Sequence, residues 1–119
     1  MKQENELGLR ISAKYNRIYV HRATLKAIGN PEFVSLGIHT QSRKLVLLAA
    51  EEQEKDALRV RYTEDNMFCI YSKVLLDGIC TVAPQIGAQD SCLLQGKLLK
   101  EQNAAAFDMN DIEMITEAE

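Results

Sequence analysis

Five basic side chains near the start of the chain offer the clearest chemistry in the sequence. They recur at intervals of three to five residues: Arg10, Lys14, Arg17, Arg22 and Lys26. Ammonium and guanidinium groups bind phosphate oxygens, and an arginine can also pair with a guanine edge in the major groove. We therefore predict that these five residues contact duplex DNA and that Arg17 reaches base edges. The alternative is a solvated basic face with ordinary surface ion pairs.

Charge is divided unevenly along the chain. Residues 1–50 carry eight basic and three acidic groups, a net +5, whereas residues 51–119 carry six basic and fourteen acidic groups, a net −8. Such an asymmetry can mark a polyanion-binding face in one half. Two alternatives stay open, namely that the two halves attract one another or that the acidic surface of a partner protein covers the basic half.

Catalytic and metal chemistry have no motif in this sequence. Neither His21 nor His39 stands in a pattern that pairs it with a nucleophile, and no phosphate loop or dinucleotide fingerprint is present. The three cysteines are 11 and 12 residues apart, which fits neither a disulfide framework nor zinc ligand spacing: Cys69, Cys80 and Cys92. We expect buried, reduced thiols, no metal, no cofactor and no enzymatic activity.

The sequence shows neither a membrane-spanning segment nor a signal peptide. No apolar run approaches the roughly 20 residues that a bilayer span requires. The first ten residues are polar where a signal peptide would be apolar. The expectation is a cytoplasmic protein without membrane contact.

The elements that must position the basic residues follow from hydrophobic periodicity. Alternating apolar residues predict a strand over residues 7–13, a turn at 14–16 and a second strand over 17–21. Residues 22–28 change to a helical period, and Gly29 and Pro31 end that helix. A hairpin is then predicted from strands 33–39 and 44–50, of which the second is apolar on both faces and should be the more buried.

The second part of the chain shows a similar order of elements. After the charged connector at 51–57, the pattern predicts strands over 58–62 and 67–71 and a helix capped by Ser72 and ended by Pro84. A closing hairpin is expected from residues 91–100 and 104–109, although "CLLQGKLL" would also suit a helix. Residues 110–119 form either a final short strand or an acidic tail.

An internal repeat is consistent with this order. Shifted by 51 positions, "IYVHRATLKAIG" at 18–29 overlays "CIYSKVLLDGIC" at 69–80, with similar residue types at five positions. Chance agreement between two short strand-helix segments is the alternative interpretation.

The stretch "NRIYVHRATLKAIGN", followed by an apolar hairpin, resembles the AbrB-like swapped-hairpin DNA-binding family, which includes AbrB, SpoVT, MazE-type antitoxins and MraZ. The residues that match the family pattern are Arg17, Ile18, Val20, Arg22, Leu25, Ile28 and Gly29. Two positions depart from it, because Asn16 stands where the family has glycine and His21 where it has proline. About 45 residues match well, and another 45 match poorly through the repeat.

The resemblance implies a mostly β fold with short helices, arranged as a swapped-hairpin or double-psi barrel of two pseudo-repeats. One half would span 1–50, the connector 51–57 and a divergent acidic half 58–119, all packed as one domain. The implied function is that of a bacterial transcription regulator that binds duplex DNA through its basic half and forms a homo-oligomer. The alternative is a non-enzymatic interaction module, antitoxin-like or structural, whose acidic half binds a basic protein.

Overall fold

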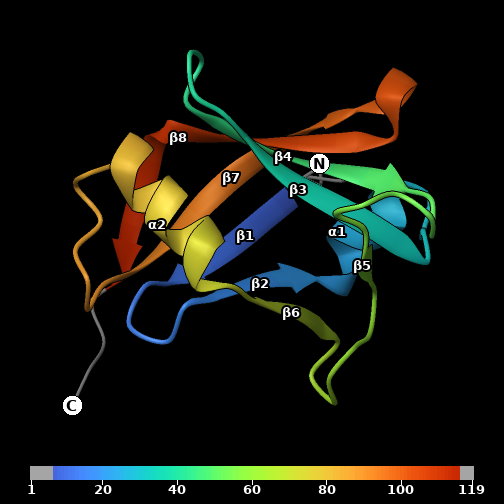
Figure 1. The fold of residues 1–119 in the computed structure, drawn as a ribbon, viewed down its shortest axis with the longest axis horizontal. Helices are drawn as coiled ribbons and strands as arrows, with labels where there is room; N and C mark the ends of the chain where they lie inside the picture. Colours follow the sequence, from blue (N-terminus) through green and yellow to red (C-terminus); the bar gives the residue numbers. More distant parts are fainter. Residues whose placement is uncertain (1–6, 116–119) are drawn as a thin grey trace, which may run out of the picture.

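The computed structural model describes residues 7–115 and contains one eight-stranded sheet with two short α-helices. The sheet curls into a half-barrel in the order β5-β3-β4-β8-β7-β1-β2-β6, and every strand pair is antiparallel (Figure 1). The strands are β1 (Leu7–Ser12), β2 (Arg17–His21), β3 (Phe33–His39), β4 (Lys44–Ala50), β5 (Leu58–Arg59), β6 (Met67–Tyr71), β7 (Ser91–Leu99) and β8 (Ala104–Ile115). The helices are α1 (Arg22–Ala27), α2 (Lys73–Val82) and the 3-10 turn η1 (Lys100–Gln102). The prediction of a mostly β protein with short helices is therefore confirmed.

The first hairpin forms where the period-two pattern predicts it. Leu7, Leu9 and Ile11 of β1 point inward and are at most 2% exposed. The chain then reverses through a turn that ends at Asn16, whose φ of 56° lies in the left-handed region that asparagine tolerates. This turn brings β2 back beside β1.

Helix α1 begins at the position where the family pattern has proline. The Nδ1 atom of His21 accepts a hydrogen bond from the Ala23 N–H at 3.0 Å, so the imidazole acts as an N-cap. Leu25 is buried beneath the helix, and Gly29 ends it with a φ of 99°. The histidine thus supplies by hydrogen bonding the helix start that proline supplies by its fixed dihedral.

Strands β3 and β4 occupy the predicted residues. Leu45 and Leu47 of β4 are fully buried, whereas Leu48 is 37% exposed on the outer face. Strand β3 has one buried residue, Val34, so β4 is the more buried strand of the pair, as predicted.

Strand β5 is shorter than predicted. Only Leu58 and Arg59 pair with β3, and residues 60–62 leave the ladder although their alternation continues. Strand β6 and helix α2 agree with the prediction, since the Oγ atom of Ser72 accepts from the Leu75 N–H at 3.1 Å and the helix ends before Pro84.

The last hairpin replaces the helix that residues 91–106 could also have formed. Gly96 allows it, because a Cβ there would lie only 2.5 Å from the ring of Phe107 on the facing strand. Strand β8 then continues through Ile115, so up to that residue the strand is the correct one of the two alternatives predicted for residues 110–119. Residues 116–119 lie outside the described residues.

The two hairpins lie against strands that come from the other part of the chain. The β3–β4 hairpin pairs with β5 and β8, and the β7–β8 hairpin pairs with β1 and β4. If β1–β4 are exchanged for β5–β8, this set of pairs is unchanged with one exception. Four residue pairs join β1 to β2, whereas no strand pairing joins β5 to β6 in the described chain.

Candidate nucleic-acid interface

The β1–β2 turn is the most firmly anchored of the basic segments. Within it the Asn16 N–H donates to the Ala13 carbonyl at 3.3 Å. Two further backbone bonds tie the turn to the second part of the chain, from the Ala13 N–H to Asp90 at 2.9 Å and from the Ser72 N–H to Asn16 at 3.0 Å. Side chains on this turn therefore project from a fixed support.

Arg17 lies between two tyrosine rings beside this turn. Its guanidinium carbon is 5.9 Å from the ring centre of Tyr15 and 5.6 Å from that of Tyr71. An Nη1 atom donates to the Tyr19 hydroxyl at 3.5 Å, and this hydrogen bond is the main cause that raises the pKa of Arg17. Lys14 adds a second cation, with Nζ 5.3 Å from the Tyr15 ring. We refer to these residues, Lys14, Tyr15, Arg17, Tyr19 and Tyr71, as the Arg17 cluster.

The cluster combines two groups that nucleic acids bind. Among residues 7–115, no carboxylate forms an ion pair with Lys14 or Arg17, so both cations face solvent without an acidic partner. The Tyr15 and Tyr71 side chains are 53% and 71% exposed. Cations bind phosphates and exposed aromatic rings stack on bases, so the arrangement suits a polynucleotide better than a single small anion.

Arg10 extends the cluster along the outer face of the sheet. It is exposed on β1, directly opposite Tyr19 of β2. Three of the five predicted phosphate contacts, Arg10, Lys14 and Arg17, therefore gather at one corner of the half-barrel.

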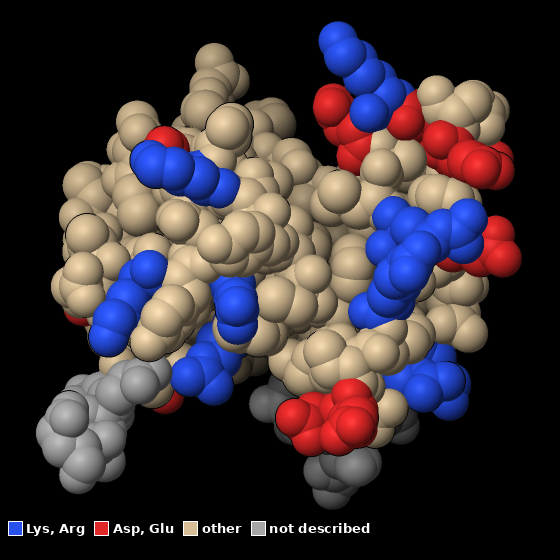
Figure 2. Space-filling view, turned by 60° about the horizontal axis from the view of Figure 1, so that its bottom comes forward, with Lys and Arg blue, Asp and Glu red and all other residues tan. Residues whose placement is uncertain are grey.

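Arg22 and Lys26 lie elsewhere, on helix α1 beyond the other end of β2. The strand separates Arg17 from His21 by about 13 Å at the usual rise per residue. The guanidinium of Arg22 is already in use, because it donates to Asn66 Oδ1 at 3.3 Å and stacks on the Tyr62 ring at 4.8 Å. The five predicted phosphate contacts therefore lie in two groups, which β2 holds apart. Figure 2 likewise shows the basic side chains of one face in separate groups with uncharged surface between them.

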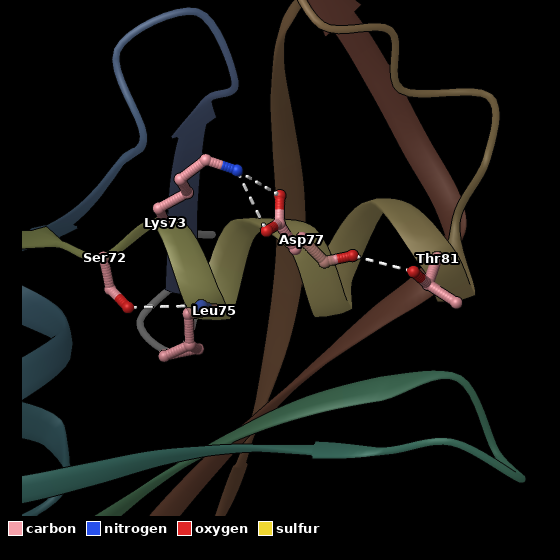
Figure 3. A network of polar contacts seen from close by, with 5 residues as sticks. All are labelled: Ser72, Lys73, Leu75, Asp77 and Thr81. Atoms are coloured by element: carbon pink, nitrogen blue, oxygen red, sulfur yellow. Dashed lines mark hydrogen bonds and ion pairs between the residues drawn. The ribbon is translucent and has the colours of Figure 1, made fainter.

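In the corresponding helix of the second part, α2, the basic residue forms an ion pair with a carboxylate. Lys73 Nζ lies 3.1 Å from a carboxylate oxygen of Asp77, and the Thr81 hydroxyl donates to the Asp77 carbonyl at 2.9 Å (Figure 3). Glu64 and Asp65 lie in the neighbouring turn before β6. This region therefore offers phosphate little attraction.

The two histidines are used in local structure. His21 caps α1, and His39 Nδ1 lies 2.7 Å from the Ser42 hydroxyl in the β3–β4 turn. No group of three or more potential ligands that could hold a metal ion occurs within residues 7–115.

The three cysteines form no disulfide and differ in how deeply they are buried. Cys92 is fully buried, and burial raises the pKa of its thiol to about 11. Cys69 and Cys80 are half-buried, so the prediction that all three are buried is wrong for these two. Burial still raises the pKa of Cys80.

The tyrosines are the site residues that the sequence analysis did not select. Tyr15 had a signal, since it stands between two basic residues in a turn. Tyr71 had none, because its place beside Arg17 depends on the pairing of β2 with β6, a contact between residues 54 positions apart.

Comparisons with known proteins add no family assignment: no family model, curated protein or solved structure matches this chain. Among the described residues, no helix has the length and apolar character needed to cross a membrane.

Proposed function

We propose that the protein is a DNA-binding transcription regulator of the AbrB-like type, which contacts duplex DNA through the Arg17 cluster and Arg10. The observation that carries the proposal is the pairing of exposed cations with exposed tyrosines on an anchored turn. Phosphate contacts by Lys14 and Arg17 would position the duplex, and a base edge would come within reach of Arg17. Arg22 and Lys26 supply a second, weaker phosphate contact from α1.

The exchange of hairpins supports the resemblance on which this proposal draws. Each hairpin pairs with strands from the other part of the chain, as two interleaved copies of one strand-helix-hairpin unit would. His21 and Ser72 cap the two helices at positions that the 51-residue shift aligns. Leu25 and Leu76, which the same shift aligns, are both buried. We infer that residues 1–50 and 58–119 are two pseudo-repeats, joined by 51–57 and packed as one swapped-hairpin domain.

Further parts of the proposal depend on the resemblance alone. In this proposal the regulator acts in a bacterial cytoplasm and forms a homodimer, which would present two Arg17 clusters to one duplex. Two linked sites bind with a higher effective concentration than one.

The proposal is tested by fluorescence anisotropy with labelled, pooled genomic duplex fragments over a range of salt concentrations. Log affinity should fall linearly with log salt concentration. The double variant Lys14→Ala with Arg17→Ala should make this dependence less steep, reducing the magnitude of the slope by about 2. A charge-matched control is Lys97→Ala with Lys100→Ala, two exposed residues away from the cluster. Absence of salt-sensitive binding at low ionic strength, or an equal loss in the control, contradicts the proposal.

The second candidate function is a non-enzymatic interaction module with the same fold and no DNA site. One observation favours it, namely that Arg22 contacts Asn66 and Tyr62 and so acts in internal structure. In this alternative the acidic half binds a basic protein. It predicts that variants of the Arg17 cluster leave partner binding unchanged.

A further inference from the structure

Strands β5 and β6, which do not pair with each other, border a cleft of about 580 Å³. Arg59 and the end of the charged connector form one wall, the residues from Phe68 to Ser72 form the other, and Leu36 lies between them. Val74 and Leu75 of α2 also line the cleft. In the first part of the chain, the corresponding strands β1 and β2 are joined in a continuous ladder.

Backbone groups of β6 point into this cleft. In an antiparallel pair, alternate residues direct both their N–H and C=O groups to the partner strand. The Ser72 N–H donates to Asn16 at 3.0 Å, so Ser72 and every second residue before it face β2. Cys69 and Tyr71 therefore direct their backbone donors and acceptors away from β2, toward β5.

The same alternation applies to the other wall. The Val60 N–H donates to the Glu32 carbonyl at 2.9 Å, so Val60 faces β3. Arg59 and Arg61 then direct their backbone groups toward β6. These groups do not meet those of Cys69 and Tyr71, because no backbone hydrogen bond joins these four residues across the cleft in the described part of the chain.

One backbone hydrogen bond still joins the two segments near the turn that precedes β6. The Thr63 N–H donates to the Met67 carbonyl at 2.8 Å, which shows that β5 and β6 start as a hairpin and then diverge. The cleft is thus an antiparallel ladder opened between two edges that both have hydrogen-bonding capacity.

The rim of the cleft is apolar and positively charged. Val74 and Tyr71 are 83% and 71% exposed, the two highest values among the large exposed hydrophobic side chains of residues 7–115. Both side chains are therefore accessible to a ligand in the cleft. Lys55 and Arg59 line the cleft against the single carboxylate of Asp56, so its charge favours an acidic ligand.

We propose that this cleft binds an extended peptide from a partner protein as an added strand on the edge of β6. The peptide has alternating apolar residues, which face Leu36 and Phe68, and an outward carboxylate that meets Lys55 and Arg59. Backbone hydrogen bonds to Cys69 and Tyr71 supply affinity, as in other cases of strand addition. The cleft shares only Tyr71 with the Arg17 cluster, so the peptide test does not require DNA binding.

The probe for the test comes from the first part of the chain, where β1 occupies the corresponding place beside β2. A fluorescent, C-terminally amidated peptide with the sequence of residues 7–12 and Arg10→Glu has the required alternation and one carboxylate. Anisotropy titration should give saturable binding to the full chain. A peptide N-methylated at alternate residues, which lacks one row of backbone donors, should bind about tenfold more weakly.

Protein variants locate the binding. Val74→Glu should weaken binding about tenfold, whereas Thr81→Glu, on an exposed position at the far end of α2, should leave it unchanged. Arg59→Glu should reverse the preference, so that the peptide with the original arginine binds better than the one with glutamate. Amide hydrogen exchange should slow at Cys69 and Tyr71 when the acidic peptide is added.

Four results would overturn the inference. They are the absence of saturable binding, equal binding of the N-methylated peptide, exchange protection away from β6, and protection of Cys69 and Tyr71 in concentrated protein alone with a doubled mass by light scattering. The last result would assign the cleft to a second copy of this chain.

Discussion

The β1–β2 region and the β5–β6 region have the same order of elements and opposite surfaces. In the first, a closed ladder supports exposed cations and tyrosines at an anchored turn. In the second, the ladder is open and the turn carries Glu64 and Asp65. The difference indicates that one strand-helix-hairpin arrangement can present two unrelated surfaces, because the fold depends on inward residues and the surface on outward ones.

Truncation of an apolar side chain should change the free energy of unfolding much more in the first region than in the second. Leu9 in the closed ladder is 1% exposed, whereas Val60, which follows β5 in the open region, is only partly buried. Leu9→Ala should lower the free energy of unfolding by about 3 kcal/mol, and Val60→Ala by about 1 kcal/mol or less. Urea denaturation of both variants measures this. Equal losses would mean that the open region is packed as tightly as the closed one.

Alkaline pH should destabilise the protein through the buried thiol beside the closed ladder. Cys92 lies opposite Ile11 of the closed ladder, and burial raises its pKa to about 11. Because the folded state holds this proton more tightly than the unfolded state, the stabilisation is complete below the unfolded pKa and is lost as pH rises from about 9 to about 11.

The expected loss is on the order of 2 kcal/mol, measured as the change in unfolding free energy of the unmodified protein relative to Cys92→Ala across that range. A Cys92→Ala variant with the same alkaline loss as the unmodified protein would refute this prediction.

Helix caps offer a smaller test of the correspondence between the regions. Ser72→Ala and His21→Ala each remove the side-chain acceptor of one helix start and should each cost about 1 kcal/mol. His21→Ser keeps an acceptor at the cap and should restore most of the loss. Thermal unfolding monitored by circular dichroism measures all three variants. A His21→Ala variant as stable as the parent would show that the imidazole does not cap α1.

The smallest effect is expected at the exposed ion pair of α2. Asp77→Asn removes the charge that Lys73 contacts at 3.1 Å and should lower stability by less than about 0.5 kcal/mol. High salt should abolish the difference between variant and parent, because exposed pairs are screened. A loss that persists in concentrated salt would mean that the pair is not a simple surface interaction.

Local patterns predicted most of the fold. Alternation and turn residues located β1, β2, β3, β4 and β6 closely, and Ser72 located the start of α2. The shortening of β5 could not be predicted, because residues 60–62 keep the alternation of a strand and only their spatial separation from β6 breaks the ladder. The exposure of Leu48 likewise depends on which face of the curled sheet remains uncovered.

The candidate site was predicted only in part. Arg10, Lys14 and Arg17 were selected from charge and spacing and do lie together, but Arg22 and Lys26 were separated from them by β2. A charge count along the chain cannot distinguish the two ends of a strand. The contribution of Tyr71 arises from pairing between distant strands, which no local pattern contains.

DNA should contact the first region and not the second. Two-dimensional amide NMR of the labelled protein during addition of a duplex measures this. We expect salt-sensitive shift changes at Lys14, Tyr15, Arg17 and Tyr71, with the turn at Glu64 and Asp65 unaffected. Shift changes centred on the Glu64 turn, or no changes at low ionic strength, would contradict this expectation.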